Sequence, residues 1–412
     1  MSPVGLGVPA FAASLRAGVG GVRKLRWSDE RIRSVVAAEC VDFGRPEAGT
    51  QVGAPDVDRL PRLVPMALAA CREALGLAGL EVGEATSRRV GVILGTGGGG
   101  IDFTLDQADS MNHGKRPSVW AITNATHGNL AGELSIRLGC KGPSLCVSTG
   151  CASSSDALGL AMELLGSQRP GSPDAWVVVG ADAHVRWETL LGMELMKVIA
   201  VREGASDAEA VTLSRPFSRT RCGYVLGEGA WAVVVERPAF ARERGTKPRA
   251  RALGYGATCD AFHRVRPSPD MVETVRAMHL AVEDAGWVPG DVEVIGYHGT
   301  STVLNDVSET AAVKAAFGAH SLRLVGTSIK GAIGHPQGAS GMASVVGLIA
   351  CLSPDDGSGG VIPPTINLDE ADPLCDLDYT PNAARASEAT RVLVNCLAFG
   401  AKNSALAIEM VK

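Results

Sequence analysis

The amino-acid sequence predicts an α/β fold in which two similar halves each build a mostly parallel sheet. Two observations support this fold class. Short runs rich in β-branched residues alternate along the chain with longer amphipathic patterns, as buried strands alternate with covering helices in α/β proteins. The order of these runs also repeats, and 412 residues provide about 200 residues for each half.

Six runs are interpreted as strands because each combines aliphatic residues with a Gly or polar turn at its end. They are RRVGVILGT (88–96), AWVVVGADA (175–183), AWAVVVE (230–236), VEVIGYHG (292–299), LRLVGTS (322–328) and VLVNCLAF (392–399). Four longer runs are interpreted as helices, since each ends at or just before a Gly or Ser, as helix C-termini often do. They cover residues 61–79, 154–167, 268–286 and 306–318.

Residues 1–240 and 241–412 are interpreted as the two halves. In the first half, the run LCV leads through STGC into a helix of small residues. In the second, LRLVGTS leads through IKGAIGHPQGASG into another such helix. Both halves close on similar strand-like runs, at 229–236 and 403–410. The charged segment ARERGTKPRARA near their junction is expected to be exposed.

The composition describes a globular chain with a large core and excludes several classes of protein. Apolar residues make up 46% of the chain and charged residues 20%; the net charge of −5 argues against a general nucleic-acid-binding surface. The longest apolar runs, such as 345–352, fall short of the roughly 18 residues that span a membrane, and no N-terminal signal sequence is evident. Ten cysteines without a CxxC pair or a zinc-site spacing predict free thiols in a reducing, cytoplasmic setting.

Cys151 is a candidate nucleophile. It lies in VSTGCASSSD, where an apolar run gives way to a helix and Gly, Ala and Ser surround the sulfur. At a helix N-terminus the backbone N–H groups lower the pKa of a thiol and can hold the oxyanion of a thioester under attack. The structural alternative is a cysteine that merely packs at the start of a small-residue helix.

Two of the eight histidines occupy comparable junctions. His298 ends a strand before a polar loop, and His335 lies in a glycine-rich turn that enters a helix, five residues after Lys330. Strand ends of this kind are where α/β sheets place ligands. A cysteine with two histidines suggests thioester chemistry, in which sulfur carries an acyl group and imidazole N–H groups stabilise an enolate. The other histidines are interpreted as ordinary surface or core residues: His113, His127, His184, His263, His279 and His320.

The run GTGGGG at 95–100 raises a different hypothesis, a nicotinamide-dependent enzyme, because it formally satisfies GxGxxG after a strand. About 20 residues later there is no second strand ending in Asp or Glu; the stretch is the polar DQADSMNHGKRPS. A glycine turn that packs against a neighbouring element is the preferred interpretation.

Six motifs together resemble those of the β-ketoacyl-acyl-carrier-protein synthases, the elongating condensing enzymes of fatty acid and polyketide synthesis. In family order they are GPSLCVSTGCASSSDALGLA, SRPFSRTRCGYVLGEGA, YHGTSTVLND, SIKGAIGHPQGASG, PPTINLD and NCLAFGAKNSALAI, and they cover nearly the whole chain. The resemblance implies a thiolase-like fold, two similar α/β halves in five layers, and an obligate dimer. It also implies an acyltransferase that condenses malonyl-ACP, with loss of carbon dioxide, with a Cys-bound acyl chain.

The resemblance assigns roles to individual residues. Cys151 would accept the acyl chain, while His298 and His335 would bind the malonyl thioester carbonyl and stabilise the enolate. Lys330 would orient and polarise His335. Phe399 would be the gate, and its backbone N–H would join that of Cys151 in the oxyanion hole. Supporting roles are expected for Glu309, Thr300, Thr302 and Asn403. No metal is expected, and no cofactor beyond the phosphopantetheine of a partner acyl carrier protein.

The sequence TGC around the nucleophile, in place of the TAC common in fatty acid enzymes, resembles the ketosynthase subunits of bacterial type II polyketide systems. Such subunits pair with a chain-length factor, a homologue without the cysteine, so this chain would be the active partner; a homodimer is the other arrangement. The alternative activity is that of a synthase II-type enzyme of fatty acid elongation. A non-catalytic partner subunit is a further hypothesis, which the intact Cys–His–His set disfavours. The acidic carrier protein would dock on basic residues such as Arg62, Arg116 and Arg202.

The sequence departs from the family pattern at several positions. The family's first strand is missing before MSPVG, from which we expect a start codon assigned too far downstream or a fused or trimmed chain. Ser344 stands where many relatives have a glutamate facing the lysine, so Lys330 is expected to contact Glu309 or a backbone carbonyl. Lys402 replaces a small residue beside the gate, where it would alter loop motion, bind an anionic group or remain solvated. Two family aspartates are replaced by Ser218 and Cys222.

Overall fold

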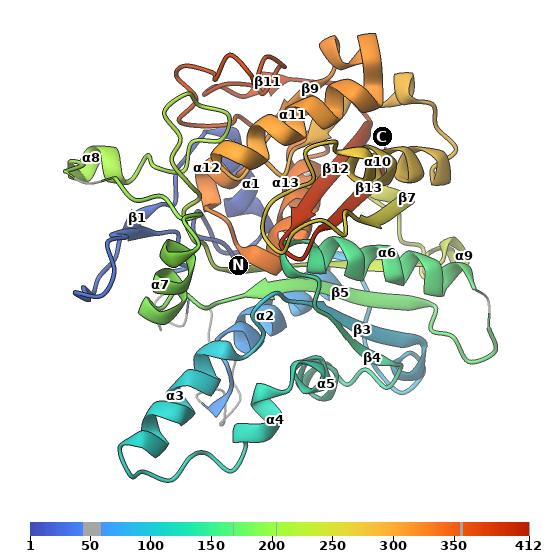
Figure 1. Cartoon of the computed structure of the whole chain (residues 1–412). Coiled ribbons are helices and arrows are strands. Elements are labelled where there is room, and N and C mark those ends of the chain that lie inside the picture. Colours follow the sequence, from blue (N-terminus) through green and yellow to red (C-terminus); the bar gives the residue numbers. More distant parts are fainter. Residues whose placement is uncertain (44–58, 168, 203, 355–356, 412) are drawn as a thin grey trace.

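Two sheets form the frame of the computed structural model, which describes residues 1–412 except 44–58, 168, 203, 355–356 and 412 (Figure 1). The first sheet has the order β4-β3-β5-β6, formed by Ser144–Val147, Val90–Gly95, Ala175–Asp182 and Gly229–Glu236. The second has the order β7-β13-β12-β8-β9, formed by Ala250–Cys259, Lys402–Met410, Arg391–Ala398, Val294–Gly296 and Val325–Thr327. Two short antiparallel pairs are β1 and β2 (Arg23–Lys24, Val36–Ala37) and β10 and β11 (Val361–Ile362, Arg385–Ala386).

Helices cover both sheets and fill the space between them. Their bounds are α1 Val8–Arg16, α2 Leu63–Leu77, α3 Ile101–Asn112, α4 Ala121–Ala125, α5 His127–Leu138, α6 Ser153–Gly166, α7 Trp187–Leu195, α8 Asp207–Ala210, α9 Pro238–Glu243, α10 Val272–Asp284, α11 Val303–Phe317, α12 Lys330–Ile333 and α13 Ser340–Leu352. Among the described residues, every helix is too short or too polar to cross a membrane.

The strand order is the same in both halves of the chain. Strands β4, β3, β5 and β6 of the first sheet correspond in order to β9, β8, β12 and β13 of the second. In each set the first three strands are parallel and the fourth is antiparallel. Each sheet is therefore mostly parallel but contains one antiparallel strand, β6 or β13. A tight turn joins β12 to β13 and leaves no room for a crossover connection. The shared order supports our division at residues 240 and 241, which remains a proposal.

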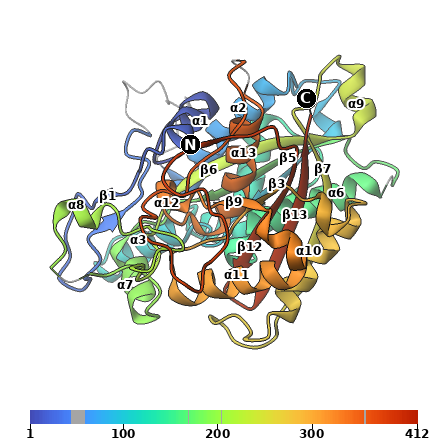
Figure 2. The ribbon, with the colours of Figure 1, turned by 90° about the horizontal axis from the view of Figure 1, so that it is seen from above.

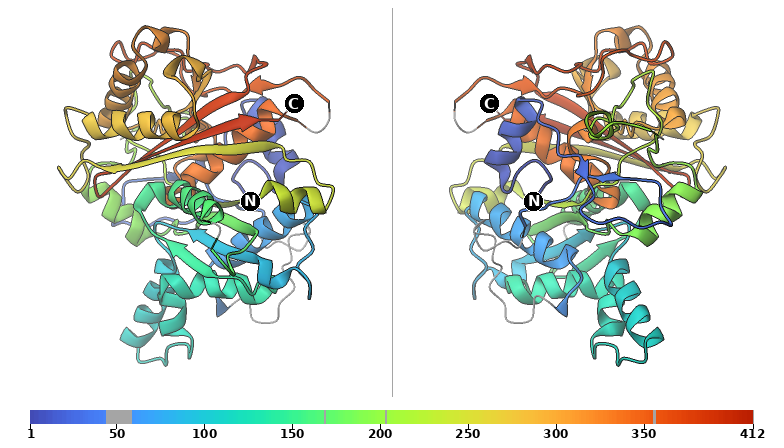
Figure 3. Two further views of the ribbon diagram at one scale, coloured as in Figure 1. Left: turned by 90° about the vertical axis from the view of Figure 1, so that its right-hand side faces the viewer. Right: turned by 90° about the vertical axis from the view of Figure 1, so that its left-hand side faces the viewer.

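The fold has five layers, as the resemblance implied. Helices α6 and α13 lie between the two sheets and share one core with both (Figure 3). Helices α2 and α5 pack on the outer face of the first sheet, and α10 and α11 lie across β12 and β13 of the second (Figure 2). Every residue of β5 is buried, which explains why its sequence is continuously apolar up to Ala181 instead of alternating.

The small residues of the central helices allow close packing. A Cβ on Gly341 of α13 would collide with the Ser155 hydroxyl of α6, and one on Gly159 of α6 would meet the Tyr255 ring of β7 at 2.4 Å or more. Strand β7 itself was not predicted. Its glycines Gly254 and Gly256 sit against the backbone of α10, so the segment lacks the β-branched pattern of a typical strand. Most of the segment 241–252 is exposed or half-buried, as expected, but it runs into this strand.

In the second sheet β7 pairs with β13; among the described residues, the corresponding place beside β6 in the first sheet is taken by Met1. The Met1 ammonium donates a 2.7 Å hydrogen bond to the Ala230 carbonyl of β6, and the Ala230 N–H donates to the Met1 carbonyl at 2.9 Å. Within the described residues, the first sheet thus has four strands and the second has five. Burial is the main reason why the pKa of the Met1 ammonium lies below its usual value.

Candidate active site

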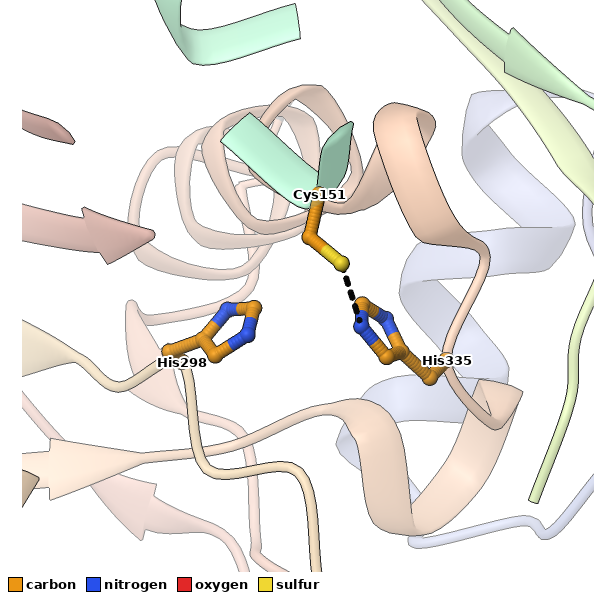
Figure 4. A group of neighbouring side chains, drawn as sticks. All are labelled: Cys151, His298 and His335. Carbon is orange, nitrogen blue, oxygen red and sulfur yellow. Dashed lines mark hydrogen bonds between the residues drawn. The ribbon is translucent and has the colours of Figure 1, made fainter. Parts of the chain in front are cut away.

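The side chains of Cys151, His298 and His335 meet in the interior, although they come from three distant segments (Figure 4). The Sγ atom of Cys151 lies 3.1 Å from Nε2 of His335. The two imidazole rings face each other edge to face with centroids 5.2 Å apart. The sulfur and one nitrogen of each ring all lie within 4.8 Å of one another. The three residues singled out in the sequence therefore share one site.

A tight turn holds Cys151 at the start of α6. Strand β4 ends at Val147, and a short 3₁₀ turn at Gly150–Ala152 leads directly into the helix. Gly150 has a φ of +64°, and a Cβ there would lie 3.2 Å from the Phe399 carbonyl oxygen. The Ser153 hydroxyl donates to the Gly150 carbonyl at 2.6 Å and accepts the Thr149 N–H at 2.9 Å. The small residues thus shape a turn against the backbone of Phe399, directly after β12.

The backbone of His298 is fixed by two buried charged groups. The carboxylate of Glu309 on α11 accepts the N–H groups of His298 at 2.7 Å and of Gly299 at 2.8 Å. The ammonium of Lys330 donates to the His298 carbonyl at 2.6 Å. Of the two contacts expected for Lys330, Glu309 or a backbone carbonyl, the structure shows the carbonyl. Its influence on His335 is electrostatic, since no hydrogen bond between the two side chains is present among the described residues.

His335 is held by the backbone of the segment before β6. Its N–H donates to the Val225 carbonyl at 2.7 Å, and its carbonyl accepts the Gly227 N–H at 3.0 Å. Gly334, directly before it, has a φ of +64° and would press a Cβ against Val225. The Tyr224 ring packs edge-on against the imidazole with centroids 5.1 Å apart. The ring is therefore oriented by packing.

Burial controls the protonation of the site. It raises the pKa of the Cys151 thiol to about 12, against the charge of Lys330 and the N–H groups of Phe399 and Cys151, which lower it. Burial, and then the Lys330 charge, hold the pKa values of His298 and His335 well below the usual histidine range. Burial thus favours a neutral thiol beside two neutral imidazoles. The expectation that the helix N-terminus lowers the thiol pKa was wrong in net effect, because desolvation outweighs the N–H dipoles.

Phe399 follows β12 and begins the turn to β13. Its backbone N–H acts on the Cys151 sulfur together with that of Cys151 itself. These are the two donors expected in an oxyanion hole. The side chain lines the cavity described next, and its role as a gate stays a prediction.

A cavity of about 180 Å³ adjoins the three side chains and is also lined by the exposed residues Lys197 and Arg266. Lys402, half-buried, lines the same cavity, so three cations surround it. Lys197 and Arg266 were not singled out in the sequence, because neither belongs to a motif and only the fold brings them to this cavity.

Three of the four supporting residues expected from the sequence, Thr300, Thr302 and Asn403, also line this cavity, whereas Glu309 is bound to the backbone of His298 and Gly299. The hydroxyls of Thr300 and Thr302 lie 2.9 Å apart, and Thr302 caps the N-terminus of α11. The amide of Asn403 donates to Asp260 at 2.7 Å and accepts the Thr274 hydroxyl at 2.9 Å. The hydrogen bonds of Thr300, Thr302 and Asn403 all go to neighbouring groups of the chain.

The loop GTGGGG is tied to a carboxylate of the chain itself. Buried Asp182 accepts the N–H groups of Gly97 at 2.9 Å, Gly98 at 3.0 Å and Gly338 at 2.7 Å, and the Thr96 hydroxyl at 2.7 Å. Donors that would cradle a phosphate in a dinucleotide site are thus already used. This geometry supports a glycine turn that joins the loop of residues 95–100 to the segment after His335.

Sequence reasoning missed the role of a second cysteine. Cys396, a buried residue of β12, donates from Sγ to the Cys151 carbonyl at 2.9 Å, and its sulfur lies 3.6 Å from Nδ1 of His298. From the sequence it was one of the ten cysteines predicted to be free thiols. The signal that could have placed it is its position three residues before Phe399 in the last motif.

The three basic candidates for carrier docking differ in the structure. Arg62 donates to the buried carboxylate of Glu228 at 2.7 Å and 3.2 Å, so its guanidinium is held within the fold. Arg116 and Arg202 are exposed. The latter two remain available as a docking surface.

Comparisons with known proteins agree with this architecture. Two family models match the chain: Beta-ketoacyl synthase, N-terminal domain, over residues 1–241, and Beta-ketoacyl synthase, C-terminal domain, over residues 249–369. The chain is 34% identical over 412 residues to 3-oxoacyl-(acyl-carrier-protein) synthase 2 of Staphylococcus aureus, with coverage of 99% of this chain and 98% of the relative.

Two solved structures are similar throughout their length. One is a type II polyketide synthase acyl-carrier protein in complex with its ketosynthase bound to the hexaketide (AntDE:AntF), with 26% identity and a TM-score of 0.88. The other is the ishigamide ketosynthase/chain length factor, with 29% identity and a TM-score of 0.86. Each match covers 100% of this chain and 97% of the other chain.

Proposed function

We propose that this chain, which belongs to the β-ketoacyl synthase family and is a condensing acyltransferase, uses Cys151, His298 and His335 to elongate a polyketide on an acyl carrier protein. The observation that supports this assignment is the convergence of one thiol and two imidazoles beside a single cavity. A sulfur that carries an acyl group and two donors for an enolate are what a decarboxylative condensation requires.

The first step transfers the acyl chain to Cys151. The thiol gives its proton to Nε2 of His335, 3.1 Å away, as the sulfur attacks the thioester carbonyl of the acyl carrier. The oxyanion accepts hydrogen bonds from the N–H groups of Cys151 and Phe399. Collapse of the tetrahedral intermediate expels the carrier thiolate, which regains the proton from His335. A neutral resting pair suits this step because no charge is buried until the substrate arrives.

The second step forms the carbon–carbon bond. N–H groups of His298 and His335 bind the thioester carbonyl of malonyl-ACP and stabilise the enolate formed as carbon dioxide leaves. The enolate carbon attacks the carbonyl of the acyl-Cys151 thioester, and the oxyanion again lies at the N–H groups of Cys151 and Phe399. Collapse releases the 3-ketoacyl chain on the carrier and a Cys151 thiolate, which takes up one proton. Lys330 and Glu309 position His298 for this step.

The carrier arm is proposed to lie along the cavity. Thr300 and Thr302 offer hydroxyls to the amides of phosphopantetheine, and Lys402 offers a charge to its phosphate. The acidic carrier itself would meet Arg116 and Arg202. The similar ketosynthase that is in complex with an acyl-carrier protein supports this choice of partner.

The polyketide branch is proposed ahead of fatty acid elongation. The sequence TGC at the nucleophile favours it, and so does the likeness to a type II polyketide synthase ketosynthase and to a ketosynthase/chain length factor. Similarity to 3-oxoacyl-(acyl-carrier-protein) synthase 2 supports the alternative, elongation of fatty acids. Both branches use the same condensation, so only the products distinguish them.

A second ketosynthase-like subunit is proposed to cover the face formed by α3, α4 and the free edge of β4. Helices α3 and α4 project from the body (Figure 1), and no residue of α3, all of which is described, is buried. Val119 is 85% exposed, Trp120 50% and Ile122 80%. Apolar side chains gathered in this way at the N-terminal end of the projecting α4 suit an interface rather than water. The partner is a second copy or a chain-length-factor homologue.

The test is mass spectrometry of carrier-bound products after incubation with acyl- and malonyl-carrier protein, with and without a homologous partner subunit. We expect 3-ketoacyl chains on the carrier, and Cys151→Ala should abolish both acyl loading and elongation. Elongation retained by Cys151→Ala would contradict the assignment. Reiterated extension to unreduced poly-3-keto chains supports the polyketide branch, whereas a single extension of long saturated acyl chains supports fatty acid elongation.

A further inference from the structure

We propose that Cys151, His298 and His335 also form a zinc-binding site in the free protein, and that the bound ion blocks acylation of the cysteine. The inhibitory consequence rests on the proposed function, whereas the binding rests on the side chains alone. The thiol sulfur and one nitrogen of each ring lie within 4.8 Å of one another, and all three are buried. Both rings turn toward the sulfur (Figure 4). One thiolate and two imidazoles are a ligand set that zinc prefers.

The distances are close to those of a tetrahedral site. Ordinary zinc bonds hold a sulfur and a nitrogen about 3.6 Å apart and two nitrogens about 3.4 Å apart. The Cys151 Sγ and His335 Nε2 atoms are 3.1 Å apart, and no two of the three ligand atoms are more than 4.8 Å apart. The zinc values lie between these two distances. Shifts of about 1 Å complete the site, and rotation of the imidazole rings can supply them. The adjoining cavity of about 180 Å³ provides room for a water molecule as the fourth ligand.

Cys396 supplies the outer contact that metal-bound histidines usually have. Its sulfur lies 3.6 Å from Nδ1 of His298, which leaves Nε2 of that ring for the ion. Its thiol is held in turn by the Cys151 carbonyl at 2.9 Å. The Nδ1 atom of His335 has no hydrogen bond among the described residues, so this ring can rotate toward an ion without losing a partner.

Charges around the site compensate for a divalent cation. Binding releases the Cys151 proton to solvent, so zinc and thiolate together add one positive charge. Buried Asp182 acts on the Cys151 sulfur and buried Glu309 acts on the Lys330 ammonium, while the cations Lys197, Arg266 and Lys402 line the adjoining cavity. The two buried carboxylates therefore offset the positive charge of Lys330 and the one that zinc and thiolate add.

Zinc and the acyl chain would compete for one sulfur. Acyl transfer requires a free electron pair on Cys151, and the same pair forms the zinc–sulfur bond. Zinc would thus inhibit the free protein and would be excluded once the cysteine is acylated. Magnesium, which prefers oxygen ligands, would not bind at this site.

Cobalt(II) added to metal-free protein tests the site without any substrate. We expect a sulfur-to-cobalt charge-transfer band in the near ultraviolet and visible bands of a tetrahedral ion, with one cobalt per chain. Zinc should displace the cobalt, and magnesium should not. Absence of these bands overturns the zinc site, even if condensation activity is present. Bands in a protein without condensation activity would leave the zinc site standing and count against the proposed function instead.

Three variants show whether the ion lies where we propose. Cys151→Ala should lose the charge-transfer band, and His335→Ala should weaken cobalt binding by about tenfold or more. Cys259→Ala, which removes an exposed thiol outside the cavity, is the control and should keep the band. Retention of the band by Cys151→Ala with one cobalt per chain would overturn the site. Circular dichroism checks the fold of each variant. Zinc should also raise the melting temperature of the wild-type protein.

Discussion

The carboxylate of Glu309 accepts the backbone N–H of His298 at 2.7 Å in the interior of the second half. Burial is the main reason why the pKa of this carboxyl rises from 4.5 to about 7, against the two N–H donors that lower it. The pair shows how the site is built: one buried acid fixes the loop that carries a proposed catalytic histidine.

The raised pKa of Glu309 predicts a pH-dependent stability. Between about pH 4.5 and about pH 7 the folded state binds the proton more tightly than the unfolded state, so the free energy of unfolding should fall as pH rises through this range. Relative to Glu309→Gln, the wild-type protein should lose up to roughly 3 kcal/mol over that window. Urea denaturation at a series of pH values measures the difference. The exposed Glu84→Gln is the control, and a wild-type-minus-Glu309→Gln difference independent of pH would contradict the prediction.

Lys330→Met should change the pH profile of condensation. The variant removes a hydrogen bond to the His298 carbonyl and a charge that, after burial, lowers the pKa values of His298 and His335. These pKa values should rise, so the acidic limb of the pH–rate profile should move to higher pH, and kcat should fall by about tenfold or more. Lys314→Met, which removes a surface ion pair with Asp376, is the control. An unchanged acidic limb in Lys330→Met would disprove the electrostatic role.

Gly150→Ala should damage the turn before the nucleophile. A Cβ at this position meets the Phe399 carbonyl at 3.2 Å with φ at +64°, so we expect a loss of roughly 1–2 kcal/mol in the free energy of unfolding. The displaced N–H groups should also slow acyl loading of Cys151, which intact-mass measurement follows. The control is Gly166→Ala at the end of α6, where a Cβ has open space. Equal behaviour of the two variants would show that the turn is not strained by a side chain.

Ile122→Asp should weaken subunit association. Ile122 is 80% exposed on α4, so the fold of one subunit should tolerate the charge while an apolar interface should not. Light scattering after gel filtration should show a shift from dimer toward monomer with an unchanged circular dichroism spectrum. Leu322→Asp, at a residue that is 74% exposed outside α3 and α4, should leave the dimer intact. A dimer that survives Ile122→Asp unaltered would place the interface elsewhere.

The sequence by itself determined six of the strands, four of the helices and the chemistry-bearing residues. Hydrophobic periodicity and composition revealed six strands and four helices. The strands were visible because runs buried on both faces are continuously apolar and their ends carry Gly or polar turns. The junctions of Cys151, His298 and His335 were visible for the same reason. The antiparallel direction of the closing strands and the glycine-containing strand β7 were missed, since both depend on packing partners that local sequence does not encode.

Only the tertiary structure decided how those residues meet and what state they take. It brought the Lys330 ammonium to the His298 carbonyl and the Cys396 sulfur to Nδ1 of His298. It also made Asp182 the acceptor for the N–H groups of the glycine loop. It also reversed the expected pKa shift of Cys151, because the cost of burying a thiolate depends on the whole surrounding fold rather than on one helix terminus. Long-range packing fixes distance and desolvation, and these two quantities lie beyond any local pattern of residues.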